Sequence, residues 1–239
     1  MLSSRKRLIV ALDVPSATQA QKIVADLGDA VTFYKVGMQL YTAEGPAVVR
    51  DLISSGRHVF LDLKYHDIPN TVASAVREAG KLGVSLLTVH GSGGSKMLTA
   101  AAEAAKQSNP AMKVIAVTVL TSMDQESLNE IMHGNLEEQV VYLAGLAQRA
   151  GCHGVVSSAR EVRSLRTRLG NDFLVVTPGV RPAGAAHGDQ ARVVTPAEAI
   201  GAGSTHLVVG RPITSAANPA QEAEKIIQEI EQAAEVARS

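Results

Sequence analysis

The chain has 239 residues, 46% of them hydrophobic, and its 23 basic and 23 acidic residues give a formal net charge of zero. That length fits one or two average domains or a single α/β barrel. The balanced charge argues against a general nucleic-acid binder and against a protein that binds anionic membranes, because both need an excess of basic residues.

Short apolar segments alternate along the chain with longer amphipathic ones. In chain order, the predicted strands are residues 8–12, 31–36, 58–63, 84–89, 113–120, 154–157, 173–177 and 206–209. They are rich in Val, Ile and Leu, which is typical of strands covered on both faces, and the helices between them imply parallel pairing. Eight such units predict an α/β fold, a (β/α)8 TIM barrel formed by a single domain over residues 1–239. A doubly wound open sheet is the alternative.

Four of the predicted helices begin with capping signals. The pairs are Ser16 with Gln19, Ser122 with Gln125, Ser158 with Glu161, and Thr195 with Glu198, the last with Pro196 at the first helical position. The long segment 122–150 is expected to hold one or two extra helical turns after the fifth strand.

Cysteine content and the N-terminal segment point to an intracellular protein. The single cysteine, Cys152, has no partner for a disulfide within the chain, and no group of Cys and His has the spacing of zinc ligands. The apolar run 8–12 is too short for the core of a signal peptide or for a membrane span. We therefore expect a cytoplasmic protein in which Cys152 is structural.

Charged residues gather at the C-terminal ends of the first three predicted strands, the end at which (β/α)8 barrels carry their chemistry. Asp13 follows the first strand, Lys35 lies in the second, and Asp62 and Lys64 end the third. Any one of them alone is more often a cap or a salt bridge. Four such residues around one barrel mouth indicate a site in which they pair as alternating charges, because unpaired buried charges are costly.

The alternation of side chains within the third strand supports this interpretation. Phe60, Asp62 and Lys64 share one face, and the apolar residues at 59, 61 and 63 share the other. The apolar face is suited to packing on the outer helices, so we expect Asp62 and Lys64 to point into the barrel mouth.

The densest signal follows the third strand. Lys64 lies in sequence between the carboxylates Asp62 and Asp67, and neighbouring negative charge favours a protonated lysine, which a proton donor to a carbanion requires. The structural interpretation of the same segment is a strand, a turn, and a helix cap at Asn70 or Thr71.

The predicted loops after the seventh and eighth strands contain Arg181 and the pair Gly210-Arg211. Barrels commonly bind phosphate at these two loops. Arginine donates paired hydrogen bonds to phosphate, and glycine lets a backbone N–H approach an anion closely. The segment 183–191 between them is predicted to be a mobile lid, from which Gln190 contacts the ligand.

Several segments together match one family. They are residues 11–13, 35–37, 62–71, His90 with 93–94, 118–122, 177–182, 188–190 and 209–212, and the most specific is the pattern D-x-K-x-x-D-I-P-N-T at 62–71. Over nearly its whole length the chain resembles the bacterial orotidine 5′-phosphate decarboxylases. The resemblance implies conversion of orotidine 5′-phosphate to UMP and CO2, the last step of UMP biosynthesis, with no metal and no organic cofactor.

The resemblance also implies roles for individual residues. Lys35, Asp62, Lys64 and Asp67 form a charged catalytic network in which Lys64 donates the proton, and Lys35 and Asp62 also contact the substrate. Asp13 binds the ribose hydroxyls, and Thr121 or Ser122 contacts the pyrimidine. The phosphate is held by Arg181, Gln190, Gly210 and Arg211. Asp67, Ile68 and Thr71 reach into the active site of a neighbouring subunit, which implies a homodimer with two shared sites.

Two alternative functions remain open at this stage. One is a magnesium-dependent sugar-phosphate decarboxylase or aldolase of the same superfamily. Such enzymes resemble this chain in the D-x-K-x-x-D run. They differ from it in carrying an acidic residue at the position of Lys35 and in lacking the Ile-Pro-Asn-Thr sequence that follows the run. The other is a non-catalytic barrel that binds a phosphate ligand, which would be expected to have lost one of the charged residues.

Overall fold

The computed structural model describes residues 3–182 and 194–236. Eight parallel strands close into a barrel, in which each strand pairs with the next along the chain and the eighth pairs with the first. The strands are β1 (Leu8–Ala11), β2 (Phe33–Gly37), β3 (His58–Tyr65), β4 (Leu86–His90), β5 (Lys113–Val117), β6 (Gly154–Val156), β7 (Leu174–Thr177) and β8 (His206–Val209). The predicted (β/α)8 barrel is therefore confirmed, and the pairing of β1 with β8 excludes an open sheet.

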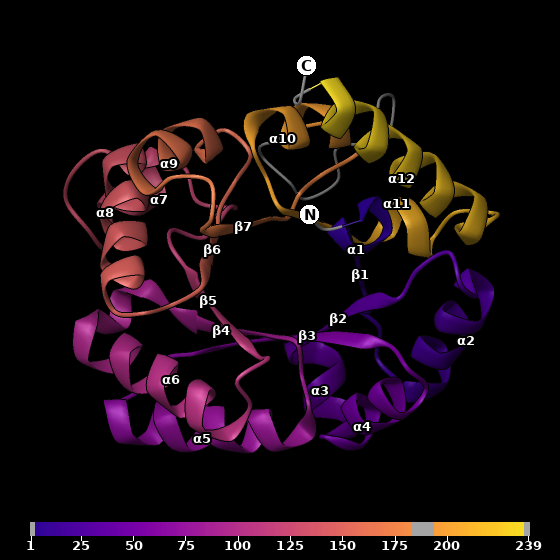
Figure 1. Ribbon diagram of the computed structural model, residues 1–239, viewed down its shortest axis with the longest axis horizontal. Helices are drawn as coiled ribbons and strands as arrows, with labels where there is room; N and C mark the ends of the chain where they lie inside the picture. The colour runs from indigo at the N-terminus through magenta and orange to yellow at the C-terminus, as the bar shows by residue number, and fades with distance from the viewer. Residues whose placement is uncertain (1–2, 183–193, 237–239) are drawn as a thin grey trace.

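Helices surround the strands as an outer ring (Figure 1). They are α1 (Ser4–Arg7), α2 (Ala17–Leu27), α3 (Met38–Glu44), α4 (Ala47–Ser54), α5 (Pro69–Leu82), α6 (Gly94–Ser108), α7 (Gln125–Asn129), α8 (Leu136–Arg149), α9 (Val162–Leu169), α10 (Pro196–Ala202), α11 (Arg211–Thr214) and α12 (Pro219–Val236), with a 3-10 turn, η1, at Gly91–Gly93. The extra turns expected after the fifth strand are α7. In the described part of the chain, no helix is long and apolar enough to cross a membrane.

The side chains of the strands form two buried layers because successive residues point to opposite faces. The layer inside the barrel consists of Ile9, Ala11, Phe33, Phe60, Leu86, Ile115, Val176 and Val208. The outer layer, between strands and helices, includes Val59 and Leu61, with Leu63 packed against it. The alternation predicted for the third strand is confirmed, and it leaves Asp62 and Lys64 on the interior face.

Two strands differ from their predicted bounds in ways that shape the barrel mouth. β3 continues to Tyr65, beyond the predicted end at 63. β5 ends at Val117, not at 120, because the chain turns where the Thr118 hydroxyl donates to the carbonyl of Val156 at 3.0 Å. The other predicted strand bounds agree or differ by one or two residues.

Two of the four capping predictions describe real caps. Thr195 and Glu198 form a complete capping box, in which each side chain accepts a hydrogen bond from the backbone N–H of the other residue. Ser16 accepts a hydrogen bond from the backbone N–H of Gln19 at 3.3 Å. These contacts satisfy N–H groups that the first helical turn leaves without partners.

The other two capping predictions are wrong. α7 begins after Asp124, whose carboxylate accepts a hydrogen bond from the N–H of Ser127, so Ser122 lies outside the cap. α9 begins after Glu161, and Ser158 lies three residues ahead of that boundary. Both serines match the spacing of a capping box, but the backbone does not enter a helix where that spacing requires.

Candidate active site

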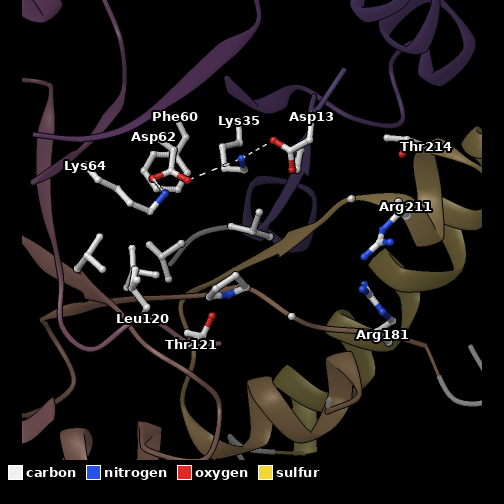
Figure 2. A pocket seen from close by; sticks show the side chains of 18 of the residues that line it. Asp13, Lys35, Phe60, Asp62, Lys64, Leu120, Thr121, Arg181, Arg211 and Thr214 are labelled. Atoms are coloured by element: carbon white, nitrogen blue, oxygen red, sulfur yellow. Dashed lines mark hydrogen bonds and ion pairs between the residues drawn. The ribbon is translucent and has the colours of Figure 1, made fainter. Parts of the chain in front are cut away.

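A cavity of about 420 Å³ opens at the C-terminal ends of the strands. Its polar lining comes from six different strands or the segments that follow them, and consists of Asp13, Lys35, Asp62, Lys64, Thr121, Arg181, Arg211 and Thr214. Figure 2 shows two carboxylates and two lysines in a row along one wall, and two arginines at one end. The apolar floor includes Ala11, Phe60, Val156, Val176 and Val208.

The four charged residues of the wall alternate in sign and are joined by ion pairs, as the sequence predicted. The Lys35 Nζ atom lies 2.8 Å from Oδ1 of Asp13 and 3.7 Å from Oδ2 of Asp62. The Lys64 Nζ atom lies 2.9 Å from the other Asp62 oxygen, Oδ1. Asp62 is thus shared by two ammonium groups, and its side chain is only 13% exposed, so each charge in this partly buried wall has a partner.

Gly37, at the end of β2, leaves space for this wall. A Cβ atom at this position would lie 2.9 Å from the Lys35 Nζ atom and 3.1 Å from Oδ1 of Asp13. The shorter contact is below the range of real Cβ contacts, so a side chain at 37 would require the Lys35 ammonium group to shift.

An irregularity in β3 directs Lys64 into the cavity. Leu61 pairs with Leu87 and Tyr65 with Val89, so four residues of β3 span the length of two residues of β4. Within this bulge Lys64 has a φ of 53°, and among the described residues it is the only non-glycine with a positive φ. A left-handed conformation costs a residue with a side chain about 1–2 kcal/mol, and such strain tends to occur at functional sites.

Asp67, Ile68 and Thr71 do not line the cavity of their own chain. All three are exposed, and the Asp67 carboxylate accepts a hydrogen bond from the N–H of Ile68 at 2.7 Å. In the described part of one chain, the ion pair of Lys64 is made with Asp62. The expectation that Lys64 lies between Asp62 and Asp67 is therefore not met within a single chain.

The cap predicted for the following helix is wrong. α5 begins at Pro69, with Ile68 in the N-cap position and no side-chain cap. Asn70 and Thr71 are already in the first helical turn. Proline at the first helical position explains this start, because its fixed φ suits the helix and its missing N–H is not needed there.

Arg181 and Arg211 form the second charged feature of the cavity. Arg181 is only 7% exposed, and burial together with the positive charge of Arg211 lowers the pKa of its guanidinium group. Gly179, Gly210 and Thr214 line the cavity beside the two arginines. Two cations held close together favour a bound anion, and paired guanidinium groups match the geometry of a phosphate.

The segment after β5 supplies one of the two expected pyrimidine contacts to the cavity. Thr121 lines it together with Val119 and Leu120, and Figure 2 shows the Thr121 hydroxyl directed inward. Ser122 is not part of the lining. Gln190 and the predicted lid at 183–191 lie outside the described residues.

Comparison with known proteins identifies the family. Residues 6–226 match the model of the orotidine 5′-phosphate decarboxylase / HUMPS family. The chain belongs to this family. The family description contains two names, so the family alone does not select one reaction.

Individual relatives are more informative. The chain is 50% identical over 237 residues to a protein of Moorella thermoacetica, and the match covers 96% of the chain and 94% of that relative. It is 53% identical over 225 residues to a protein of Halorhodospira halophila, and this match covers 94% of the chain and 95% of that relative. Both are named orotidine 5′-phosphate decarboxylase. A crystal structure of orotidine 5′-phosphate decarboxylase from Lactobacillus acidophilus superposes with a TM-score of 0.84 at 41% identity, covering 93% of the chain and 98% of that structure.

Two further residues lie near the site of this family member, and only Thr88 was missed from the sequence, since His90 belongs to the segments that match the family. Thr88, in β4, contacts Asp62 and Lys64 but had been assigned only to an apolar strand. The His90 ring lies 5.3 Å from that of His66, and burial followed by the charges of His66 and Lys64 lowers the pKa of His90. A polar residue on the interior face of a strand was the available signal for Thr88.

Proposed function

We propose that the chain is a single-domain carboxy-lyase that converts orotidine 5′-phosphate to UMP and CO2. The observation that carries the proposal is the arrangement of one cavity. Two lysines and two aspartates alternate along one wall of it, and a pair of arginines lies at one end. The names of the relatives from Moorella thermoacetica and Halorhodospira halophila support it, because each shares about half of its residues with the chain.

In the proposed reaction, the bond between C6 of the pyrimidine and the carboxylate breaks, and its electron pair stays on C6. That pair occupies an sp2 orbital in the ring plane, where the π system delocalises it poorly. The Lys64 ammonium group stabilises the developing charge, and a cation already fixed in a site with little water is effective because it needs no reorganisation. Lys64 then transfers a proton from Nζ to C6, and the neutral amine regains a proton from solvent.

Asp62 and Lys35 have supporting roles in this proposal. Asp62 fixes the Lys64 ammonium group at 2.9 Å, and its carboxylate lies near the departing carboxylate of the substrate. Repulsion between the two carboxylates raises the energy of the bound substrate. Lys35 balances the second oxygen of Asp62 and, with Asp13, faces the ribose hydroxyls.

The phosphate is assigned to Arg181, Gln190, Gly210 and Arg211, and the pyrimidine to Thr121. Support comes from one end of the cavity, where the two arginines converge. The phosphate lies far from the bond that breaks. Its binding energy contributes to the transition state by holding the substrate in place, so loss of the phosphate contacts is expected to lower kcat as well as raise KM.

The proposal includes a homodimer in which Asp67, Ile68 and Thr71 complete the site of the partner subunit. Ile68 is 67% exposed and Met38 is 55% exposed, and both follow the C-terminal ends of the neighbouring strands β3 and β2. Exposed large apolar side chains beside a functional site often indicate an interface. In such a dimer, the partner's carboxylate supplies the second negative charge that the sequence placed next to Lys64.

The proposed enzyme is cytoplasmic and uses no metal or organic cofactor. Its one cysteine is buried, and burial raises the pKa of this thiol to about 12, which suits a structural residue in a reducing compartment. Within the described residues, no three His, Cys, Asp or Glu side chains come together as a possible metal site.

The test is the loss of ultraviolet absorbance of orotidine 5′-phosphate incubated with the purified protein in EDTA. Loss of absorbance with UMP as the product is the expected result and also establishes independence from divalent metal. No loss from the folded protein, followed by magnesium-dependent turnover of a sugar phosphate, would replace the proposal with the sugar-phosphate alternative. Binding of UMP without any turnover would indicate a non-catalytic barrel.

A further inference from the structure

Thr88 is a fully buried residue directly behind the charged wall of the cavity. It lies in the middle of β4, on the interior face shared by Leu86. The cavity lining includes residues of β3 and β5, the strands on either side, but none of β4. Thr88 therefore has no direct access to a bound substrate, and any effect on the reaction has to pass through its neighbours.

Two hydrogen bonds fix the orientation of the Thr88 hydroxyl group. Its Oγ1 atom accepts a hydrogen bond from the backbone N–H of Lys64 at 2.9 Å and donates one to Oδ1 of Asp62 at 3.0 Å. A backbone N–H can only donate and an ionised carboxylate can only accept. The hydroxyl hydrogen must therefore point at Asp62, and one side chain links the backbone of Lys64 to the carboxylate of Asp62.

Both partners of Thr88 are in conformations that need support. Lys64 has a φ of 53° within the bulge of β3, where its N–H does not face the regular ladder of β4. The torsion that turns an aspartate carboxylate is broad and weakly restrained by itself. Because Oδ1 of Asp62 receives hydrogen bonds from both Thr88 and Lys64, its other oxygen is directed at Lys35, 3.7 Å away.

We propose that Thr88 is a positioning residue for the decarboxylation. Its hydroxyl group holds the Lys64 backbone in the left-handed conformation and holds the Asp62 carboxylate in the orientation that serves both lysines. The inference rests on the proposed function, because it assigns Thr88 a role in placing the proposed proton donor. Substrate contacts at the arginines are separate from Thr88 and do not depend on it.

The test compares Thr88→Val, which keeps the shape and removes the hydroxyl, with Thr88→Ser, which keeps the hydroxyl. Misplacement of a reacting group by about 1 Å costs on the order of 100-fold in rate, so we expect Thr88→Val to lower kcat by about that factor. Its KM should stay within about threefold of the original value, because the phosphate contacts are intact. Thr88→Ser should recover most of the lost kcat.

Thr205→Val is the matched control. The Thr205 hydroxyl likewise accepts one hydrogen bond and donates one, in its case from the N–H of Val175 at 3.0 Å and to the carbonyl of Val175 at 2.9 Å. Thr205 lies just before β8, at the opposite end of the barrel. We expect this variant to lose stability without losing kcat. A kcat for folded Thr88→Val within about twofold of the original, or a Thr88→Ser variant as slow as Thr88→Val, would overturn the proposal. If Thr88→Val does not fold, Thr88→Ala takes its place with the same criteria.

Hydrogen exchange at the Lys64 amide separates this inference from the proposed function. The amide should be protected in the unmodified protein, in Thr88→Ser and in Thr205→Val, and should exchange faster in Thr88→Val. Failure of the unmodified protein to decarboxylate orotidine 5′-phosphate would remove the proposed function but leave this measurement valid. Unchanged exchange in Thr88→Val would show that Thr88 does not hold the Lys64 backbone.

Discussion

The guanidinium groups of Arg181 and Arg211 point toward each other across one end of the cavity, although both are positively charged (Figure 2). The charge of Arg211 contributes to the lowered pKa of Arg181, which is itself almost fully buried. The two positive charges repel each other in this setting. A dianionic phosphate bound between them would relieve the repulsion and accept charge-assisted hydrogen bonds from both guanidinium groups. This end of the cavity is therefore suited to binding a phosphate rather than to catalysis.

Removal of Arg211 is expected to weaken transition-state binding strongly. Arg211→Ala should lower kcat/KM by about 3 kcal/mol, on the order of 100-fold, through loss of a charged contact. The matched control is Arg50→Ala, because Arg50 is exposed on α4. Steady-state kinetics with orotidine 5′-phosphate measure the effect.

A substrate without phosphate makes this test specific. With orotidine, Arg211→Ala and the unmodified enzyme should show nearly the same kcat/KM, because neither makes the phosphate contact. Equal rates with orotidine 5′-phosphate itself would contradict the assignment of Arg211 to the phosphate.

Replacement of Lys64 should abolish the reaction while leaving the fold intact. Lys64→Ala removes both the stabilising charge and the proton donor, and each such contribution is typically worth 100-fold or more, so we expect a loss of at least about 10⁴-fold in kcat. Asp62 keeps Lys35 as a partner at 3.7 Å, which limits the loss of stability. Lys22→Ala on α2, which breaks an exposed ion pair with Asp26, is the control. Substantial turnover by folded Lys64→Ala would exclude Lys64 as the donor.

The proposed shared site predicts complementation between two inactive variants. Lys64→Ala disables the site of its own subunit, whereas Asp67→Ala is expected to disable the site of the partner. In a mixed dimer one site carries both changes and the other carries none. Random mixing of equal amounts should therefore restore about a quarter of the sites. Subunit exchange has to be shown independently. If the exchanged mixtures then stay as inactive as their components, Asp67 does not act across the interface.

The barrel and its charged wall were predictable because both follow from short-range patterns. Alternation along a strand decides which face Asp62 and Lys64 occupy, and the C-terminal ends of parallel strands meet at one mouth. Asp13 and Lys35 were found by the same rule. Two of the three ion pairs connect neighbouring strands, and the third, between Lys64 and Asp62, lies within β3, so strand order and side-chain alternation bring the four residues together.

The remaining features depend on contacts that a pattern does not encode. Thr88 was overlooked because a buried threonine in an apolar strand is usually structural. The register of β3 with β4 places it beside Asp62, and the bulge of β3 brings the N–H of Lys64 to it. The proposed role of Asp67 depends on a second chain, which a pattern within one chain does not describe. Ser122 and Ser158 match a capping pattern by spacing alone, and the backbone decides where the helix begins.

Acid should destabilise the protein partly through His206, which is 4% exposed at the start of β8. Burial, and then the charge of Arg7, lower the pKa of His206 from 6.5 to about 4. Between these values the unfolded chain binds more protons than the folded chain, so stability is complete above pH 6.5 and falls as the pH drops toward 4. The contribution at stake is about 3 kcal/mol, since each pKa unit corresponds to about 1.4 kcal/mol.

His206→Asn tests this contribution because asparagine does not titrate and offers a polar atom to the Thr205 hydroxyl, which lies 3.0 Å from Nδ1 of His206. Urea unfolding at pH 7 and pH 5 gives the free energy of unfolding of both proteins. The unmodified protein should lose more stability between the two pH values than the variant does. Part of the loss should persist in the variant, because burial also lowers the pKa values of His90 and His153. Equal losses in the two proteins would mean that His206 does not contribute to the acid sensitivity.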